Sequence, residues 1–250
     1  MRKFGLIGYP LGHSFSKRYF TEKFINEHIP DCSYENYPLT SLTMLHSLIA
    51  EEADLCGLNV TIPYKSEVIK LLDRISPEAK EIGAVNVLKI NRLKGDFKLS
   101  GFNSDVTGIR NSLLPYITES VRNAIVLGTG GSSRAVCWML KKLGLNVKVV
   151  SRTSKPGVIT YSDIDSHLLS MTDFIINTTP LGMFPDIESK PEIDYKLLNN
   201  KHILFDLVYN PELTTFLKMG AERGCTTISG IKMLHSQAER AWEIWNNDKL

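Results

Sequence analysis

The feature that most constrains the fold of this chain is a glycine-rich turn between an apolar run and a helical pattern. Residues 123–127 are mostly apolar, and Gly128, Gly130 and Gly131 follow directly. Apolar residues then recur over 135–143 at helical spacing. Glycines permit a tight turn and the close approach of a ligand, while a helix N-terminus offers unpaired N–H groups to a phosphate. The sequence therefore predicts a strand, a turn and a helix that bind a dinucleotide.

The match to the G-x-G-x-x-G pattern is incomplete. Ser133 stands where the third glycine would be, and Gly131 and Ala135 are the small residues nearby. Taken alone, the turn leaves open an α/β protein that binds no nucleotide. The residues of this turn expected to contact a cofactor are Gly128, Thr129, Gly130, Gly131 and Ser132.

The next strand pattern, residues 146–150, ends at a segment without a carboxylate. An NAD-binding unit places Asp or Glu there for the ribose 2′-hydroxyl. This chain has Ser151, Arg152 and Thr153, with Lys155 shortly after. A guanidinium with neighbouring hydroxyls suits a 2′-phosphate, so the sequence favours NADP over NAD. The alternative is that Arg152 and Lys155 are ordinary solvated side chains of a loop.

Composition narrows the function classes. The chain has 250 residues, 43% of them hydrophobic and 22% charged, with a net charge of +2. No block of like charge indicates a nucleic acid or membrane partner, and no apolar run has the length of a membrane span. We expect a cytoplasmic protein that acts on a small molecule. The four cysteines have no metal-ligand spacing and are expected to be buried free thiols, with no metal site: Cys32, Cys56, Cys137 and Cys225.

Polar side chains follow the first predicted strand, residues 3–8. The loop after this strand contains Ser14 and Ser16, and a helical pattern follows. Ser16 could simply cap that helix. Capping needs only one hydroxyl, so the pair also suits a small anion or a polyhydroxylated ligand at the carboxyl end of the strand.

A second polar group follows the strand pattern over 57–62. Asn59 and Thr61 share one face of this strand, Pro63 ends it, and Lys65 is expected to begin a helix. A lysine is usually a solvated surface group. Its place directly after a strand with two polar side chains makes Lys65 a candidate for chemistry.

Two further polar residues lie near predicted element ends. Asn86 interrupts an apolar strand pattern over 82–90, and a buried amide must find hydrogen-bond partners. Asp105 directly precedes a helical pattern that begins at Val106. An N-cap role would explain this carboxylate, and its second oxygen could still hold an ammonium group.

Seven stretches resemble one family. Those ahead of the glycine turn are Ser14-x-Ser16, Asn59-Val60-Thr61-Ile62-Pro63-Tyr64-Lys65, Gly83-Ala84-Val85-Asn86 and Gly101-Phe102-Asn103-Ser104-Asp105. Those after it are Asn177-Thr178-Thr179-Pro180-Leu181-Gly182-Met183, Asp206-Leu207-Val208-Tyr209-Asn210-Pro211, and Gly230-Ile231-Lys232-Met233-Leu234 with Gln237-Ala238. In this order they resemble the shikimate dehydrogenases over the whole chain.

The resemblance implies the NADPH-dependent, reversible reduction of 3-dehydroshikimate to shikimate in aromatic amino acid biosynthesis. Lys65 would be the general acid and base, paired with Asp105. The substrate would be bound by Ser14, Ser16, Asn59, Thr61, Asn86, Tyr209 and Gln237. The serine pair would meet the carboxylate of the substrate, and Thr61, Asn86 and Gln237 its ring hydroxyls. NADP would be bound by Gly128, Thr129, Gly130, Gly131, Ser132, Ser151, Arg152, Thr153, Thr178, Leu207 and Gly230.

The departures from the family pattern are modest. Phe20 stands where the family often has His, and Val106 replaces a frequent Gly. Both changes bear on packing near the substrate entrance. Ser151 replaces the Asn of an Asn-Arg-Thr signature, but Arg152 and Thr153 are kept.

We expect two α/β domains. Residues 1–105 with 230–250 would form a substrate domain with a mixed, mostly parallel sheet, and residues 106–229 a Rossmann-like NADP-binding domain. The elements expected in the second half are strands over 173–177 and 202–207, a helix over 193–198 and a long helix over 231–245.

Three other functions stay open. A quinate/shikimate dehydrogenase with relaxed substrate or NAD use would share nearly every motif. A nucleotide-sensing regulator on this scaffold would not need Lys65 and Asp105 together. A methyltransferase would need a ribose-binding carboxylate after Val150, which is missing. The sequence leaves open a monomer or a homodimer.

Overall fold

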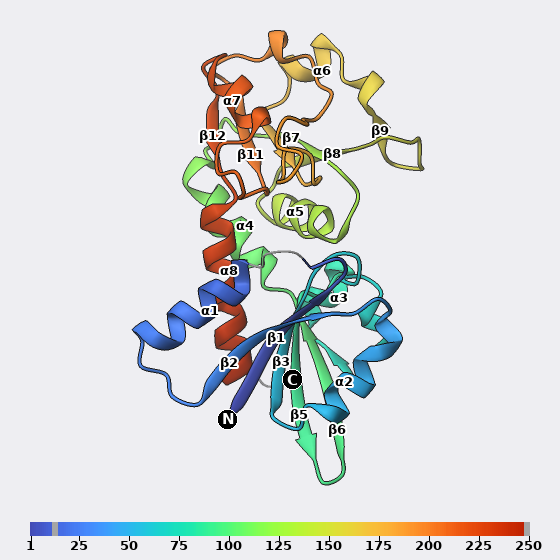
Figure 1. Ribbon diagram of the computed structural model, residues 1–250. Coiled ribbons are helices and arrows are strands. Elements are labelled where there is room, and N and C mark those ends of the chain that lie inside the picture. Colours follow the sequence, from blue (N-terminus) through green and yellow to red (C-terminus); the bar gives the residue numbers. More distant parts are fainter. Residues whose placement is uncertain (12–14, 248–250) are drawn as a thin grey trace. The chain divides into compact units, whose positions relative to one another are not determined.

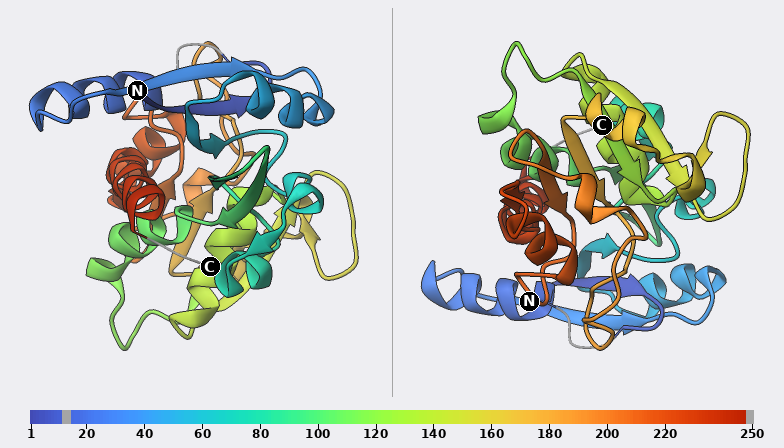
Figure 2. Two further views of the ribbon diagram at one scale, coloured as in Figure 1. Left: turned by 90° about the horizontal axis from the view of Figure 1, so that it is seen from below. Right: turned by 90° about the horizontal axis from the view of Figure 1, so that it is seen from above.

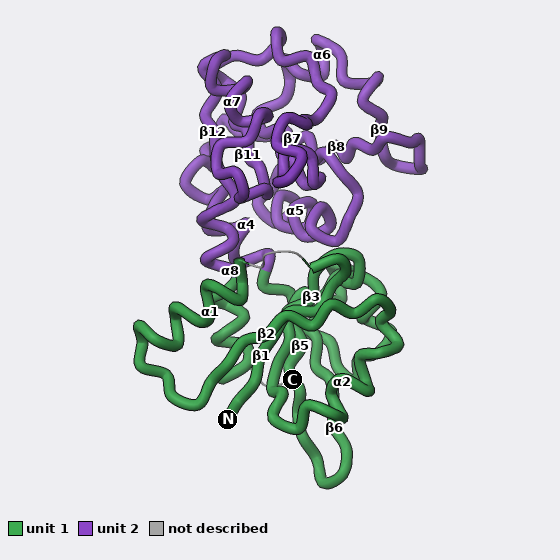
Figure 3. The backbone as a smooth tube through the Cα atoms, viewed as in Figure 1, with its two compact units in different colours: residues 1–104, 238–250 green, residues 105–237 purple. Residues whose placement is uncertain are grey.

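The computed structural model describes residues 1–11 and 15–247, and the chain divides into two compact units (Figure 3). Unit 1 comprises Met1–Ser104 and Ala238–Leu250, and unit 2 comprises Asp105–Gln237. The sequence places the first division at 105/106, and the second at 229/230, ahead of the last helix. That helix, α8 (Ile231–Asn246), is continuous and contributes residues to both units (Figures 1 and 2).

Unit 1 is built on a mixed six-stranded sheet with the order β2-β1-β3-β5-β6-β4. Its strands are β1 (Arg2–Gly8), β2 (Cys32–Pro38), β3 (Leu55–Val60), β4 (Arg74–Ile75), β5 (Val87–Leu93) and β6 (Asp96–Phe102). Its helices, apart from its part of α8, are α1 (Phe15–Asn26), η1 (Leu42–Met44), α2 (Leu45–Glu51), η2 (Val68–Leu71) and α3 (Pro77–Ile82). Strand β1 pairs in parallel with both β2 and β3, whereas β5 is antiparallel to β3 and β6.

Helices cover both faces of this sheet (Figure 1). Leu45 and Ile49 of α2 and Ala79 of α3 belong to the core on one face. The core on the other face is aromatic and includes residues of α1 and α8, such as Phe20 and Trp245. A Cβ at Gly57 would lie 2.3 Å from the Trp245 indole, so the strand approaches α8 closely only because this residue is glycine.

Unit 2 has six parallel strands in the order β12-β11-β10-β7-β8-β9. The strands are β7 (Asn123–Leu127), β8 (Asn146–Ser151), β9 (Ile159–Thr160), β10 (Phe174–Asn177), β11 (Ile203–Asp206) and β12 (Thr226–Ile228). The helices are α4 (Asp105–Leu113), η3 (Leu114–Tyr116), α5 (Gly131–Lys142), η4 (Tyr161–Asp163), α6 (Ser166–Ser170), η5 (Tyr195–Leu197) and α7 (Thr215–Ala221). Counted within the unit, this is the 3-2-1-4-5-6 order of a Rossmann fold.

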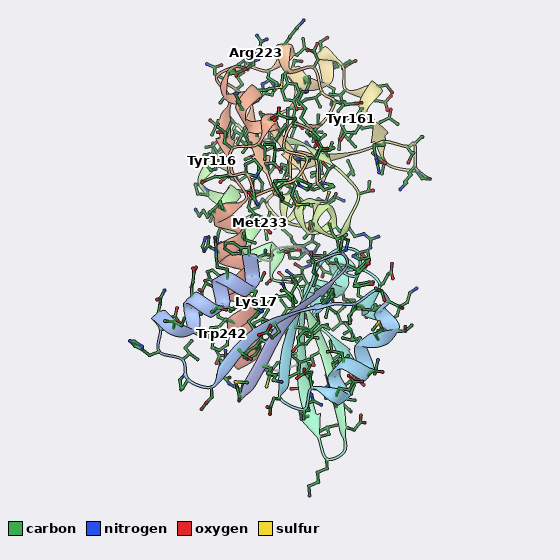
Figure 4. The ribbon with its side chains drawn as sticks, viewed as in Figure 1. Lys17, Tyr116, Tyr161, Arg223, Met233 and Trp242 are labelled. Atoms are coloured by element: carbon green, nitrogen blue, oxygen red, sulfur yellow. The ribbon has the colours of Figure 1, made fainter. Side chains whose placement is uncertain are left out.

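The two halves of α8 pack differently, as Met233 and Trp242 illustrate (Figure 4). In unit 2, a Cβ at Gly108 of α4 would lie 2.4 Å from the Met233 carbonyl oxygen, so α4 and α8 approach closely. In unit 1, the Trp242 ring meets the edge of Phe4 at 5.4 Å between centroids.

Four local predictions were wrong. Lys65 lies in a series of turns, and its carbonyl accepts the N–H of Val85 (2.7 Å) from a distant part of the chain. Ser16 lies inside α1, which already begins at Phe15. Residues 82–86 end α3 and turn, so the strand begins at Val87. Within 193–198, only Tyr195–Leu197 is helical, as a short 3-10 helix, and the Asp194 side chain accepts the Lys196 N–H (3.0 Å).

Candidate functional site

The predicted substrate residues of unit 1 follow β1 and β3, and the loops after these strands are tied together. Thr61 N–H donates to the Ile7 carbonyl (2.9 Å), and Tyr9 N–H donates to the Ile62 carbonyl (3.1 Å). Strand β1 lies between β2 and β3 in the sheet; the connection to β2 passes through α1 on one face, and the connection from β2 to β3 passes through α2 on the other. Ligands of α/β sheets bind at the carboxyl ends of strands at such a point.

Asn86 is held in place by Ser104. Its side chain is 4% exposed, and its Oδ1 accepts the Ser104 N–H (2.7 Å) while its Nδ2 donates to Ser104 Oγ (3.1 Å). The backbone carbonyl of Asn86 also accepts the Val60 N–H (2.9 Å), which joins it to the end of β3. Ser104 was not among the predicted site residues, although it lies in one of the stretches that carry the resemblance.

Asn59, at the end of β3, is bonded through both ends of its amide. Its Oδ1 accepts a hydrogen bond from the Tyr34 hydroxyl (2.7 Å), and its Nδ2 donates to the Asn86 carbonyl (3.3 Å). Ser16 forms a hydrogen bond with the same Tyr34 hydroxyl. Burial raises the pKa of Tyr34, so this phenol stays protonated at physiological pH. The structure thus brings Ser16, Asn59 and Asn86 together, with Tyr34 as a member that the sequence did not indicate.

The predicted catalytic pair is divided between the units. Lys65 is partly buried in the turns after β3, in unit 1. Asp105 is 1% exposed and is the first residue of α4, in unit 2. Their pairing stays a prediction. Ser14 lies outside the described residues.

The glycine turn of unit 2 requires glycine at its first position. Gly128 has φ +114°, and a Cβ there would lie 2.6 Å from Thr178 Oγ1. The Thr178 hydroxyl donates to the Leu127 carbonyl (2.6 Å), so the turns after β7 and β10 are in direct contact. Ser133, in the place of a third glycine, is buried and donates from Oγ to the Gly128 carbonyl (2.7 Å). The Ser133 hydroxyl, in the first turn of helix α5, therefore links that helix to the glycine-rich loop.

The rest of this turn suits a dinucleotide. Gly130 is the N-cap of α5, with no side-chain capping bond, and a Cβ there would meet no atom within 4 Å. Space above a helix N-terminus is a favourable place for a pyrophosphate. At the end of β8, Ser151 Oγ accepts the Thr153 N–H (3.3 Å), and the side chains of Arg152 and Thr153 are exposed. With no carboxylate between Ser151 and Lys155, the segment fits a 2′-phosphate.

Two more predicted cofactor residues meet at the ends of the neighbouring strands. Leu207 N–H donates to the Asn177 carbonyl (3.0 Å), which places the turn after β11 beside Thr178. A Cβ at Gly230 would lie 2.5 Å from the Leu207 carbonyl oxygen, so only glycine allows this approach. The structure therefore brings Gly128, Thr178, Leu207 and Gly230 together at the carboxyl ends of the strands.

A buried polar cluster lies under these turns. Asp206 is 0% exposed, and its carboxylate accepts bonds from Asn177 Nδ2 (3.0 Å), Val208 N–H (3.0 Å) and Thr214 Oγ1 (2.6 Å). Burial raises the pKa of Asp206 to about 7, although these three donors oppose the shift. Asn177 also ties Thr179 and Leu181 into the same cluster. Sequence reasoning missed Asp206, since a carboxylate at a strand end is usually solvated.

The remaining predicted residues are Tyr209 and Gln237, both partly buried in unit 2. Burial raises the pKa of Tyr209, so its hydroxyl is a neutral hydrogen-bonding group. Gln237 belongs to α8. Within residues 1–11 and 15–247, no group of three His, Cys, Asp or Glu side chains could hold a metal ion, and no helix is long and apolar enough to cross a membrane.

Comparisons with known proteins agree with these observations. Residues 6–88 match the family model of the shikimate dehydrogenase substrate binding domain. The shikimate dehydrogenase (NADP(+)) of Methanococcus aeolicus is 36% identical over 98% of this chain and 92% of its own length. The crystal structure of shikimate dehydrogenase 1 from Peptoclostridium difficile superposes with a TM-score of 0.82 at 35% identity, covering 100% of this chain and 93% of that one. The enzyme of Thermus thermophilus, in complex with NADP(H) and shikimate, gives 0.84 at 29% identity, covering 99% and 94%.

Proposed function

Because this chain belongs to the shikimate dehydrogenase family, we propose that it catalyses the reversible, NADPH-dependent reduction of 3-dehydroshikimate to shikimate. The observation that carries this proposal is the 36% identity to an NADP(+)-dependent relative over 98% of the chain. The neutral hydrogen-bonding groups of unit 1 suit a substrate with several hydroxyls. The glycine turn and Arg152 of unit 2 suit a dinucleotide with a 2′-phosphate.

NADPH, when bound, supplies the hydride for the carbonyl carbon of the substrate. Gly128, Thr129, Gly130, Gly131 and Ser132 would hold its pyrophosphate. Ser151, Arg152 and Thr153 would hold the 2′-phosphate, and Thr178, Leu207 and Gly230 the nicotinamide. These assignments rest on the glycine geometry of the turn and on the exposed side chains after β8.

Lys65 would act as general acid and base. Reduction of a ketone builds negative charge on its oxygen, and a proton donor nearby removes that charge. The Lys65 ammonium can give this proton, and the amine can take it back from the hydroxyl in the reverse reaction. Asp105 would orient the ammonium by accepting a hydrogen bond from it. Asn86 would hold a ring hydroxyl, with its amide fixed by Ser104.

The remaining substrate contacts follow the family. Ser14 and Ser16 would meet the substrate carboxylate, while Thr61 and Gln237 would hold ring hydroxyls. Asn59 and Tyr209 would each supply one more neutral hydrogen-bonding group to the substrate. All six are neutral, so they recognise a polyhydroxylated ring by the geometry of their donors and acceptors rather than by charge.

The proposed function is tested by following the formation of NADPH or NADH by purified protein. Shikimate and quinate are each supplied with NADP⁺ and with NAD⁺. We expect turnover with shikimate and NADP⁺. Turnover with quinate or a preference for NAD⁺ would instead indicate a quinate/shikimate dehydrogenase with relaxed substrate or cofactor use. Absence of turnover in all four mixtures, from folded protein that still binds NADPH, would favour a nucleotide-sensing regulator.

A further inference from the structure

Tyr34 is a buried tyrosine that touches two of the predicted substrate-binding side chains. It is 2% exposed on β2, and its hydroxyl bonds to Asn59 Oδ1 (2.7 Å) and to Ser16. Asn59 and Ser16 come from different elements, the end of β3 and the first turn of α1. One phenol therefore connects side chains from two elements that are both predicted to bind the substrate.

The orientation of the Asn59 amide follows from its partners. The Asn86 carbonyl can only accept a hydrogen bond, so Nδ2 must face it and Oδ1 must face Tyr34. The oxygen of the Asn59 amide is therefore occupied inside the protein, and one N–H of Nδ2 is left for a ligand. Held in this way, Asn59 offers a donor to a substrate oxygen. Without Tyr34, the amide could turn over or rotate away.

The ring of Tyr34 is itself fixed by aromatic packing. Phe20 stacks on it with centroids 4.7 Å apart and planes 12° apart, and Trp245 lies 6.3 Å away. These contacts hold the ring independently of its hydroxyl. Removal of the hydroxyl alone should therefore leave the ring and the fold of unit 1 in place.

We propose that Tyr34 is a positioning residue for substrate binding, which fixes Asn59 as a hydrogen-bond donor and holds the Ser16 side chain beside it. This inference rests on the proposed function, because it takes shikimate as the ligand. Tyr34 is buried and has its effect through these two side chains. Its loss should weaken substrate binding rather than slow the chemical step.

The test is Tyr34→Phe, which removes only the hydroxyl. We expect the KM for shikimate to rise about tenfold, the value of one hydrogen bond of ordinary strength. The turnover number and the KM for NADP⁺ should change less than about twofold, since an interaction that is the same in ground and transition states affects KM alone. An unchanged KM for shikimate would overturn the proposal.

Tyr195→Phe is the matched control. Tyr195 is also buried, 6% exposed, and its hydroxyl donates to the Pro191 carbonyl (2.9 Å) within unit 2. The two variants lose the same group from a similar environment, and melting temperatures show how far each is destabilised. We expect the KM for shikimate to be unchanged in Tyr195→Phe. A tenfold rise there too would attribute the effect to general destabilisation and overturn the proposal.

A double-mutant cycle shows whether Tyr34 acts through its partners. In an Asn59→Ala or a Ser16→Ala background, Tyr34→Phe should raise the equilibrium dissociation constant for shikimate, measured by calorimetry, by clearly less than tenfold. A full tenfold effect in both backgrounds would contradict the proposal. If the wild-type protein binds NADPH but neither oxidises nor binds shikimate, the proposed function fails, and this inference fails with it. Tight binding by the wild type with equal affinity in Tyr34→Phe overturns the inference alone.

Discussion

Asn177 donates a hydrogen bond to the Asp206 carboxylate across 3.0 Å, with both side chains 0% exposed at the ends of adjacent parallel strands. The donors around this carboxylate are all neutral: Asn177, Thr214 and the Val208 N–H. They weaken the cost of burial but do not remove it, which is why the pKa of Asp206 rises to about 7. This pair therefore gives the stability of unit 2 a pH dependence of its own.

Asp206 should make the protein less stable as the pH rises from about 4 to about 7. Its pKa is about 7 in the fold against 3.8 as a model value, so the folded state binds the proton more tightly over this range. The contribution of Asp206 to the free energy of unfolding should fall by about 1.4 kcal/mol per pH unit, about 4 kcal/mol in total, and level off above pH 7. Denaturant unfolding at several pH values measures this slope.

Asp206→Asn should remove that slope, because the amide does not titrate. Asp163→Asn is a suitable control of opposite sign. Asp163 is exposed, and its pKa is lowered by the N–H and hydroxyl of Thr160, so its contribution is present above pH 4 and lost below it. Parallel stability curves for wild type and Asp206→Asn between pH 4 and 7 would contradict the prediction.

Lys65→Ala should slow the reaction while NADP binding stays intact. Loss of a general acid and base costs about 10²–10⁴ in rate. Turnover is measured by NADPH absorbance, and cofactor affinity by calorimetry. Lys70→Ala removes an exposed lysine a few residues later in η2 and should leave both unchanged. If Lys65→Ala lost NADP affinity to the same extent as turnover, Lys65 would contribute to cofactor binding rather than to proton transfer.

Arg152→Ala should weaken the preference for NADP⁺. Charge-assisted hydrogen bonds to a phosphate contribute about 1.5–3 kcal/mol, so the KM for NADP⁺ should rise about 10- to 100-fold while that for NAD⁺ changes little. Lys148→Ala is the control, because this exposed lysine lies on the preceding strand β8. A similar rise for both cofactors would show that Arg152 does not meet the 2′-phosphate.

The first two glycines of the turn after β7 should respond differently to alanine. Gly128→Ala places a Cβ in a backbone of φ +114°, 2.6 Å from Thr178 Oγ1, and should cost about 1–3 kcal/mol of stability. Gly130 has φ −78° and open space around it, so Gly130→Ala should melt close to wild type and lose NADP affinity. Equal melting temperatures for the two variants would refute the geometric argument.

The sequence predicted most of the fold, because the informative signals are local. The two-domain α/β architecture, the turn after β7 and the long helix α8 follow from apolar periodicity and glycine placement, and the structural comparison confirms the architecture. Periodicity could not show that the Lys65 carbonyl is taken by Val85, from a distant part of the chain. The local pattern alone therefore predicted a helix at Lys65, where the structure has turns.

The candidate site could be predicted as a set of residues but not as a set of contacts. The bonds of Tyr34 to Asn59 and of Asn177 to Asp206 join residues 25 and 29 positions apart. Such pairs depend on strand order and register, which the sequence does not display. Ser133 was recognised only as a missing glycine, although its hydroxyl closes the turn onto the Gly128 carbonyl.

The division of helix α8 has a consequence for synthesis on the ribosome. Unit 2 is one uninterrupted segment, Asp105–Gln237, whereas unit 1 needs residues from both sides of that segment. Trp245, which packs on Phe4 and against Gly57, leaves the ribosome only after the whole of unit 2. The nascent N-terminal segment therefore carries an uncovered aromatic face while unit 2 is being made. Unit 2 can fold first, and unit 1 is completed only after its C-terminal residues have been synthesised.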